Sequence, residues 1–325
     1  MLEGAAEIGD SWRRRWDSLR LFTPARYNGL PGMAFPGHRY ALPGKDEVAS
    51  YLQAYATRFS LPIQTASRVM ALERDGERFI VRTADANLMC SSVVVTTGAY
   101  QRPFIPEFAS QLSKAIVQLH SSEYRNPSQL PEGPVLVVGA GNSGTQIALE
   151  LGSSRRVWLS GRNTGTIPRR LLGRDIYDWL WPTLMRPPVK SWIGRRLTGG
   201  QMFTGDPVIG LAKGEIERST VTRTARTAGE RDGHPVLEDG TVLPEIAAVI
   251  WCTGFRPNFS WIQLPVFGAD GYPAHRRGLV DAVPGLGFLG LRYQHRFNSS
   301  LLGGVGADAE FVVSSLMKNR QRTAA

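Results

Sequence analysis

Cysteine is scarce in this sequence, and long apolar runs are missing. The 325 residues include two cysteines, Cys90 and Cys252, which lie far apart and form no C-x-x-C motif. This usage argues against a redox-active dithiol, a zinc site and a disulfide scaffold. No apolar run reaches the roughly 18 residues that a membrane span needs, and residues 1–11 contain no apolar signal-peptide core. We therefore expect a cytoplasmic protein, and membrane association is not expected.

Acidic residues are outnumbered by basic ones. Lys and Arg total 38 against 28 Asp and Glu, which gives a formal net charge of +10. Such a balance is typical of proteins that bind nucleic acid or an anionic membrane surface, but here the arginines are scattered. We therefore favour attraction of phosphate-bearing cofactors and expect no nucleic-acid partner. The length and the 42% hydrophobic content predict about two globular domains with a sizeable core.

A glycine-rich turn is the most informative stretch. Residues 135–138, VLVV, are a continuous apolar run that predicts a strand buried on both faces of a parallel sheet. Gly139, Gly141 and Gly144 follow with the G-x-G-x-x-G spacing. The first allows a tight turn, the second lets the backbone approach a pyrophosphate, and the third lets helix and strand pack closely. The alternative is an ordinary strand, turn and helix without a ligand.

The next helix and strand complete a βαβ unit. The helix should begin near Ser143, so that the amides of Asn142 and Ser143 and the positive helix end face a phosphate. The second strand is expected over residues 156–160. From Ser160 to Arg162 its tip reads Ser-Gly-Arg and carries no acidic residue to hold a ribose 2′-hydroxyl. The sequence therefore predicts NADP(H) as the coenzyme.

Other stretches predict the rest of the organisation. Residues 9–37 lack periodicity and indicate a structured loop, either functional or a surface lid over a satellite core. A helix is expected over residues 45–59, with a core-facing stripe formed by Val48, Tyr51, Leu52, Tyr55 and Phe59. Short strands are expected over residues 63–65, 68–74, 78–83 and 87–91, with a turn at Asp75–Gly76. Residues 92–98 and 247–254 are apolar strands that both end in Thr-Gly; the alternative for them is two ordinary strand-to-loop turns.

The N-terminal part resembles a known family. Gly9, Trp12 and Arg13, followed by DSLRLFTPARY and FPG, resemble the region after the first dinucleotide fold of flavin-containing monooxygenases, especially the bacterial CzcO-like branch. The resemblance covers nearly the whole chain. In that family an acidic residue at the position of Glu3 holds the adenosine ribose of FAD, and the segment Gly9 to Arg13 runs along the FAD pyrophosphate and flavin. The backbone at the position of Val69 meets the FAD adenine.

The same resemblance assigns further positions to the FAD site. The dipeptides Thr97–Gly98 and Thr253–Gly254 match the segments that link the two dinucleotide folds and pack near the flavin. Gly306 and Asp308, at the start of the C-terminal helix, match a segment that closes over the flavin. For Asp308 two roles stay open, acceptance of a ribityl hydroxyl and an ordinary helix N-cap.

Half of another family fingerprint is present. His120 and Tyr124 match the end of F-x-G-x-x-x-H-x-x-x-Y, whereas Lys114 and Ile116 replace its Phe and Gly. This half-match fits the divergent bacterial branch and argues against the drug-metabolising subgroup. We expect His120 to be a structural histidine with its ring nitrogens bonded.

The resemblance implies an α/β architecture of two interleaved Rossmann-like dinucleotide-binding folds. An FAD-binding domain formed by residues 1–130 and 247–325 would hold an inserted NADP-binding domain at residues 131–246. We expect the first fold to be incomplete at its N-terminus, because the family's first strand and glycine loop would precede Met1. A start codon placed too late and an NADP-binding remnant without activity both stay open.

The chemistry that the resemblance implies is monooxygenation. In the family NADPH delivers hydride to FAD, reduced flavin takes up O2, and a flavin C4a-hydroperoxide passes one oxygen to a small organic substrate. Because the cofactor carries the bond changes, no side chain is named as catalytic and no metal is expected. An NAD(P)H-dependent flavin reductase without oxygenation is the alternative. Whether the protein forms a homodimer stays open.

Residues 173–210 are the least regular stretch. They contain three tryptophans, several prolines and flanking arginines. Trp with Arg suits a membrane interface, but the prolines break any long helix, so we prefer a lid over an apolar substrate channel. Just before them, Arg169 and Arg170 form a basic pair that either meets the 2′-phosphate of NADP(H) or lies in solvent.

Overall fold

The chain forms two lobes joined by two crossing segments. A computed structural model describes residues 1–98, 100–191, 207–210, 216 and 219–323. The described helices and helical turns are α1 (Asp10–Arg13), η1 (Ala25–Tyr27), α2 (Lys45–Arg58), η2 (Glu107–Gln111), η3 (Pro127–Gln129), α3 (Asn142–Leu151), α4 (Ile176–Leu180), the π-helical turn η4 (Trp181–Met185) and α6 (Gly306–Thr323). The described strands are β1 (Val69–Asp75), β2 (Arg78–Thr83), β3 (Asn87–Cys90), β4 (Val93–Val95), β5 (Arg102–Pro103), β6 (Val117–His120), β7 (Val135–Val138), β8 (Val157–Ser160), β9 (Thr166–Ile167), β10 (Arg170–Leu171), β11 (Arg174–Asp175), β12 (Val208–Ile209), β13 (Val221–Thr224), β14 (Thr227–Arg231), β15 (His234–Leu237), β16 (Ala248–Trp251), β17 (Phe255–Arg256) and β18 (Leu286–Phe288).

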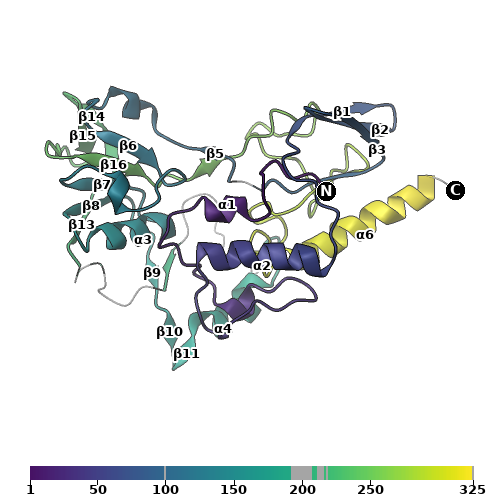
Figure 1. Ribbon diagram of the computed structural model, residues 1–325, viewed down its shortest axis with the longest axis horizontal. Coiled ribbons are helices and arrows are strands. Elements are labelled where there is room, and N and C mark those ends of the chain that lie inside the picture. Colours follow the sequence, from purple (N-terminus) through teal and green to yellow (C-terminus); the bar gives the residue numbers. More distant parts are fainter. Residues whose placement is uncertain (99, 192–206, 211–215, 217–218, 324–325) are drawn as a thin grey trace.

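A five-stranded parallel sheet is the centre of the first lobe, at the left of Figure 1. Its strand order is β13-β8-β7-β16-β6, and every neighbouring pair is parallel. All four residues of β7 are buried, as the apolar run at residues 135–138 predicts. Strands β6 and β16 come from the chain on either side of residues 131–246, so the sheet draws on segments outside the expected NADP-binding domain. The division into domains at these boundaries stays a prediction.

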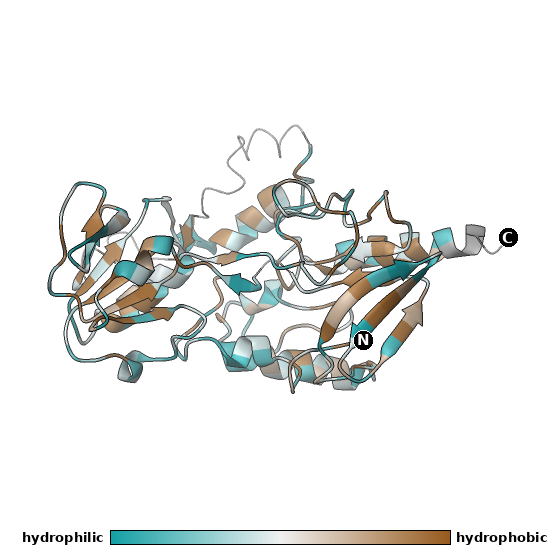
Figure 2. Cartoon of the chain, turned by 90° about the horizontal axis from the view of Figure 1, so that it is seen from above, coloured by the Kyte–Doolittle hydropathy of each residue, from teal (hydrophilic) through white to brown (hydrophobic). Residues whose placement is uncertain are grey.

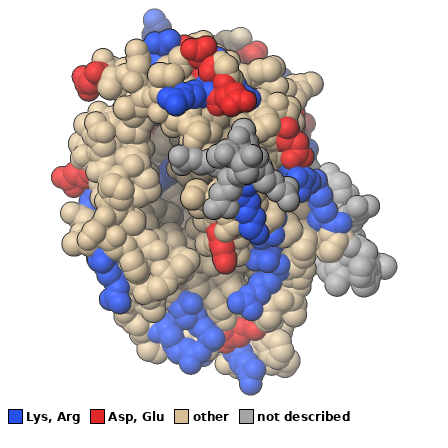
Figure 3. Space-filling view, turned by 90° about the vertical axis from the view of Figure 1, so that its right-hand side faces the viewer, with Lys and Arg blue, Asp and Glu red and all other residues tan. Residues whose placement is uncertain are grey.

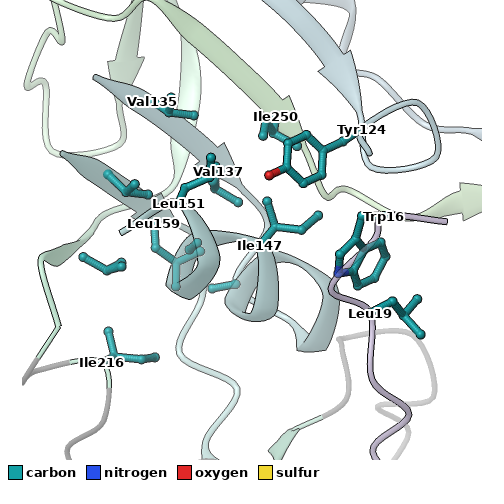
Figure 4. Close-up of a cluster of buried hydrophobic side chains, with 14 of the residues drawn as sticks. Trp16, Leu19, Tyr124, Val135, Val137, Ile147, Leu151, Leu159, Ile216 and Ile250 are labelled. Atoms are coloured by element: carbon teal, nitrogen blue, oxygen red, sulfur yellow. The ribbon is translucent and has the colours of Figure 1, made fainter. Parts of the chain in front are cut away.

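Helix α3 covers one face of this sheet. Its residues Ile147 and Leu151 are fully buried, as the helical spacing predicts. Figure 4 shows Ile147 beside Val137, with Trp16 and Leu19 of the N-terminal segment at the end of the same cluster. The loop at residues 9–37 therefore contributes to the main core of this lobe, and its Phe22 and Tyr27 also pack on the smaller cluster of Ile176, Tyr177 and Trp181.

The second lobe combines an antiparallel meander with a parallel strand pair. The meander is β1-β2-β3, with the predicted turn at Gly76, whose φ is +58°. The strand expected at residues 63–65 does not form; Gln64 makes an isolated bridge with Leu2. Helix α6 packs on the pair β18 and β4 through the buried Val312 and Leu316. Figure 2 shows apolar strands in both lobes.

Helix α2 carries the apolar stripe that its sequence predicts, except at its end. Val48 and Tyr51 are 0% and 2% exposed. The helix ends at Arg58, so Phe59 leaves the stripe and is 41% exposed, with its ring 4.7 Å from that of Tyr55. The prediction that Phe59 faces the core is wrong because the residue lies in the C-cap of the helix.

The two crossing segments between the lobes pair with each other. Strand β5 pairs antiparallel with β17, with Phe255 opposite Pro103 and Arg256 opposite Arg102. The guanidinium of Arg256 also lies over the ring of Phe104, 4.3 Å from its centroid. Each strand follows one of the two Thr-Gly dipeptides, so both dipeptides lie at the junction of the lobes.

Candidate functional site

The three glycines of the loop between β7 and α3 have three different surroundings. Gly139 has φ +110°, and a Cβ there would lie 2.3 Å from the carbonyl oxygen of Cys252. A Cβ on Gly144 would lie 1.8 Å from the carbonyl oxygen of Gly139. A Cβ on Gly141 would meet no described atom within 4 Å. The first and third glycines are therefore required by packing, whereas the second borders open space where a ligand can approach the backbone.

The start of α3 borders the same space. The helix begins at Asn142, so the amides of its first turn have no partner within the helix. The Asn142 side chain, in contrast, is bonded to the segment around β12: its Oδ1 accepts from the amide of Ile209 at 3.0 Å, and its Nδ2 donates to the carbonyl of Pro207 at 3.4 Å. The backbone amides of Asn142 and Ser143, together with the positive helix end, are what this loop offers to a phosphate.

At the tip of β8, the two side chains assigned to the coenzyme have different surroundings. Ser160 is fully buried, and its Oγ donates to the carbonyl of Ala225 at 2.9 Å and accepts from the amide of Thr227 at 2.7 Å. Its hydroxyl therefore holds β8 to the following hairpin. Arg162 is exposed and forms no ion pair with any residue that the structure describes. Of these two, Arg162 is the side chain available to a ligand.

Arg169 does not belong to this basic tip. Its Nε lies 2.7 Å from Oδ2 of the buried Asp175, and its Nη1 donates to the carbonyl of Phe22 at 2.7 Å. It thus links the chain after β9 to the N-terminal segment. The idea that Arg169 and Arg170 meet a 2′-phosphate as a pair is wrong for Arg169, because its charge is already neutralised by Asp175.

The two Thr-Gly dipeptides flank the paired crossing strands: one precedes β5 and the other precedes β17, so they lie at opposite ends of the antiparallel pair. Gly98 and Gly254 have φ +66° and +81°. Gln101 connects the crossing segments: its Nε2 donates to the carbonyl of Gly98 at 2.6 Å, and its Oε1 accepts from the amide of Asn258 at 3.0 Å. The hydroxyl of Thr253 donates to the carbonyl of Phe104. Sequence reasoning did not find Gln101, because its role depends on contacts across the junction.

His120 has the structural role expected for it. Its side chain is fully buried, its Nε2 lies 3.0 Å from the carbonyl oxygen of Gly254, and its Nδ1 accepts from the amide of Ser122 at 3.2 Å. These partners assign the neutral ring with the proton on Nε2. His120 therefore holds the end of β6 against the second Thr-Gly dipeptide.

A cation at the same junction was not singled out from the sequence. The guanidinium of Arg15 lies 5.3 Å from the centroid of the Phe255 ring, and the His120 ring meets Phe255 edge-on at 4.9 Å. No carboxylate of the described residues pairs with Arg15, and burial lowers its pKa from the usual value. Its sequence signal was three adjacent arginines, which gives no reason to choose the third.

Burial of neutral histidine makes stability depend on pH. Burial lowers the pKa of His120, and in the same way those of His275 and His295, below the ordinary value of 6.5. The unfolded chain then binds more protons than the folded chain as the pH falls below about 6.5. We expect the free energy of unfolding, measured with urea, to be lower at pH 5.5 than at pH 7.5, and the difference to shrink in His120→Gln. Equal stability at the two pH values would contradict this.

The residues assigned to FAD in the N-terminal segment lie in two groups. Glu3 lies beside the chain that leads into β1: its amide donates to the carbonyl of Gln64 at 2.9 Å, and its carbonyl accepts from Ser67 at 2.8 Å. This places Glu3 and Val69 in the same part of the second lobe. Glu3 is exposed, with its Oε1 accepting from the amide of Ala5 at 2.8 Å.

The second group has clear packing roles. Gly9 has φ +91°, and a Cβ there would lie 2.8 Å from Cα of Ala49 in α2. Arg13 bonds within its own segment and to α2, donating to the carbonyl of Ile8 at 2.8 Å and to Gln53 at 3.1 Å. Trp12 packs against the core of the first lobe. These contacts fix the segment between the lobes, and they leave its contact with a cofactor as a prediction.

The start of α6 is a buried polar cluster. Asp308 is 1% exposed; its Oδ2 accepts from Ser299 Oγ at 2.6 Å, and its Oδ1 lies 3.4 Å from Nε of Arg277. It is the third residue of the helix, so it is not an N-cap residue. Nearby along the chain, Asn298 Oδ1 and Arg296 Nε are buried and have no hydrogen-bond partner among the residues that the structure describes. Because buried polar atoms are nearly always bonded, these orphans fit a polar ligand such as FAD.

Gly306 is required by packing. A Cβ there would lie 2.7 Å from Cγ of Pro31. A Cβ on Gly303 would lie 2.0 Å from the carbonyl oxygen of Tyr27, and one on Gly304 would lie 1.9 Å from that of Asn298. The loop before α6 is therefore pressed against the N-terminal segment.

Both cysteines are free thiols, in agreement with their spacing. Cys252 lies against Gly139 and Gly144, and burial raises the pKa of its thiol to about 12. A protonated buried thiol is inert, so Cys252 fills space behind the glycine loop.

Comparisons with known proteins agree with this geometry. The profile of the pyridine nucleotide-disulphide oxidoreductase family matches residues 1–183. An uncharacterized CzcO-like oxidoreductase of Geobacillus kaustophilus is 43% identical over 316 residues, covering 96% of this chain and 89% of that protein. The uncharacterized oxidoreductase CzcO of Bacillus subtilis is 36% identical over 320 residues, covering 97% and 91%. A flavin-containing monooxygenase from Stenotrophomonas maltophilia has a TM-score of 0.78 and 26% identity, covering 98% and 90%.

The parallel sheet, its glycine loop and the second α/β lobe place this protein among the Rossmann-type dinucleotide-binding oxidoreductases. Taken with the relatives, these features show that the chain belongs to the CzcO-like branch of the flavin-containing monooxygenase family, as the N-terminal motifs indicate. It is an enzyme of the flavin-dependent monooxygenase class.

Proposed function

We propose that the protein is an NADPH- and FAD-dependent monooxygenase that oxygenates a small organic substrate. The observation that carries the proposal is the contrast within the glycine loop. A side chain on Gly141 would enter open space, whereas a side chain on Gly139 or Gly144 would clash with backbone. An open backbone at a helix N-terminus fits a pyrophosphate. When bound, FAD would accept hydride from NADPH and activate O2 for transfer of one oxygen atom.

The residues of this chain would bind and orient the two dinucleotides. The amides at the start of α3 would hold the NADPH pyrophosphate, and Arg162 would contact its 2′-phosphate. Glu3 and Val69 would meet the adenosine end of FAD, and the polar cluster around Asp308 would meet its ribityl or flavin part. The fit to FAD rests on the buried orphan atoms of that cluster.

The lobe junction would set how the two dinucleotides face each other. The crossing strands β5 and β17 each follow a Thr-Gly dipeptide, and Gln101 and His120 hold these segments in place. In this proposal residues 1–130 with 247–325 carry FAD and residues 131–246 carry NADPH. Substrate would react where these parts meet, shielded from water by the packed junction.

Replacing Gly141 by Ala tests the coenzyme site. The added methyl group meets no atom of the described residues within 4 Å, and the φ of −80° suits alanine. We therefore expect unchanged thermal stability but an NADPH affinity lower by about tenfold or more, because one charge-assisted hydrogen bond contributes roughly 1.5–3 kcal/mol. Calorimetry with NADPH measures the affinity. Wild-type affinity in this variant would contradict the placement of the pyrophosphate.

The redox part is tested with the wild-type protein. It should show the visible absorption of bound flavin after incubation with FAD, and NADPH should bleach that absorption without O2. Oxygen uptake should then yield an oxygenated product when a soft nucleophile or a carbonyl compound is present. NADPH binding without flavin binding would contradict the proposal, and NADPH oxidation without oxygenated product would indicate a reductase.

A further inference from the structure

The hairpin of β10 and β11 exposes two leucines at its apex. Leu171 is 46% exposed. Leu172 is 82% exposed, which is the largest exposed fraction among the large hydrophobic residues that the structure describes. Figure 1 shows this hairpin protruding at the lower end of the molecule, beside α4. A single exposed leucine is ordinary, but two adjacent ones on a protruding turn form an apolar apex.

The turn itself is made in a conformation that leucine disfavours. Leu172 has φ +51° and Gly173 has φ +75°, the left-handed pair of a type I′ turn. Asn, Asp and Gly are the preferred residues at the first of these positions, because a branched side chain there is strained. Neither folding nor packing of the described residues favours leucine at this position.

The hairpin is held firmly to the body of the protein. Asp175, at its base, pairs with Arg169 and caps α4 by accepting from the amide of Tyr177 at 3.0 Å. The indole Nε1 of Trp179 donates to the carbonyl of Leu171 at 3.3 Å, and the Arg174 guanidinium lies 5.6 Å from the centroid of the Trp179 ring. The apex is therefore a fixed protrusion.

An arginine lies on each strand of the hairpin beside the apex, Arg170 on β10 and Arg174 on β11. Residues 168–190 contain four arginines and one lysine against two aspartates. The aspartates are bonded inside the protein, Asp175 to Arg169 and Asp178 to Arg26, Tyr27 and Tyr40. The exposed basic side chains on the hairpin are those of Arg170 and Arg174. Figure 3 shows one face of the molecule, with mostly Lys and Arg among the charged side chains toward its lower end.

We propose that this hairpin docks the protein on an anionic lipid bilayer, with Leu171 and Leu172 in the interface and the arginines at the phosphates. Apolar side chains flanked by basic ones and by an interfacial tryptophan are the combination that binds such surfaces. A protruding two-residue apex is too small for a stable protein interface, which needs about 800 Å² on each partner. The overall charge of +10 acts in the same direction.

The contact would be peripheral and reversible. No helix among the described residues is both long and apolar enough to cross a bilayer. The inference revises the expectation of no membrane association, and it does not depend on either cofactor. It would bring the enzyme close to apolar small molecules dissolved in the bilayer.

Replacing Leu172 by Asn separates docking from folding. Asn-Gly is a preferred type I′ pair, so the variant should melt at the same temperature as wild type or higher. In co-sedimentation with vesicles of phosphatidylcholine and phosphatidylglycerol, its affinity should fall by about tenfold or more, because one buried leucine side chain is lost. Leu88→Thr is the control: it removes a leucine that is 41% exposed on β3 of the other lobe, and it should bind vesicles as wild type does.

Charge is tested on the same assay. Arg170→Glu with Arg174→Glu should weaken binding to the anionic vesicles, and salt at 0.5 M should weaken binding of wild type, since both reduce attraction to the lipid phosphates. Failure of wild type to bind anionic vesicles at low salt would overturn the proposal, as would equal binding by Leu172→Asn. A wild-type dimer that Leu172→Asn converts to a monomer, without vesicle binding, would overturn it in favour of a second copy of the chain.

Discussion

Exchange of Arg162 for Asp is expected to weaken NADPH binding by about a hundredfold and to make NADH the preferred coenzyme. Arg162 is exposed at the tip of β8 and pairs with no described carboxylate, so its charge is available to a 2′-phosphate. Loss of a charge-assisted contact costs about 3 kcal/mol, which corresponds to about a hundredfold in Kd. An aspartate at the same tip can instead accept from the 2′-hydroxyl of NADH.

The same strand supplies the control for this exchange. Arg156 precedes β8 at its opposite end, is exposed, and lies over the Trp158 ring at 4.3 Å. Arg156→Asp makes the same change in net charge without touching the tip, so it should leave the ratio of NADPH to NADH affinity unchanged. Calorimetric titration of both variants with both coenzymes measures that ratio. If Arg162→Asp keeps the wild-type ratio, the assignment of the 2′-phosphate to this tip fails.

The glycine loop could be predicted from the sequence because its requirements are local. Each glycine stands at a fixed offset from a strand and a helix, and the structure gives Gly139 a left-handed φ and Gly144 a close backbone contact. The same holds for α3, whose buried face follows from helical spacing. Where the backbone geometry of about ten consecutive residues decides the local structure, the sequence is enough to predict that structure.

Side chains that choose between several partners could not be placed in this way. Ser160 and Arg162 are two residues apart at one strand tip, yet the first bonds to Thr227 and the second is free of described ion pairs. Arg169 and Arg170 are adjacent, yet Asp175 takes the charge of the first. These partners come from later segments whose approach no local pattern encodes. Gln101 and Arg15 escaped notice for the same reason.

The lobe junction shows how separate patterns become one unit. The two Thr-Gly dipeptides look alike in the sequence, but the pattern does not say that the segments after them pair. Strands β5 and β17 pair antiparallel, so the dipeptides lie at opposite ends of this pairing, and the ring of His120 bonds to the carbonyl of Gly254. A substitution at either dipeptide therefore acts on the segments that connect the two lobes. An enzyme that must align two dinucleotides requires such a connection.

Replacing Gly144 by Ala is expected to destabilise the sheet lobe severely. The new Cβ would lie 1.8 Å from the carbonyl oxygen of Gly139 and 3.2 Å from Cβ of Cys252, so backbone must move on both sides. Overpacking of a core costs about 1–3 kcal/mol and more when backbone is displaced. We expect a loss of about 3 kcal/mol or more in the free energy of unfolding, and a fall of about 10 °C in Tm.

Gly141→Ala is the matched control, because it adds the same methyl group three residues away where no described atom lies within 4 Å. Thermal melts followed by circular dichroism should show the large shift for Gly144→Ala alone, while NADPH titration should show weakened binding for both variants. The pair separates the two roles of glycine in one loop, packing at position 144 and access for the ligand at position 141. A Gly144→Ala protein that melts with wild type would mean that α3 does not pack on β7 as closely as the contact to Gly139 requires.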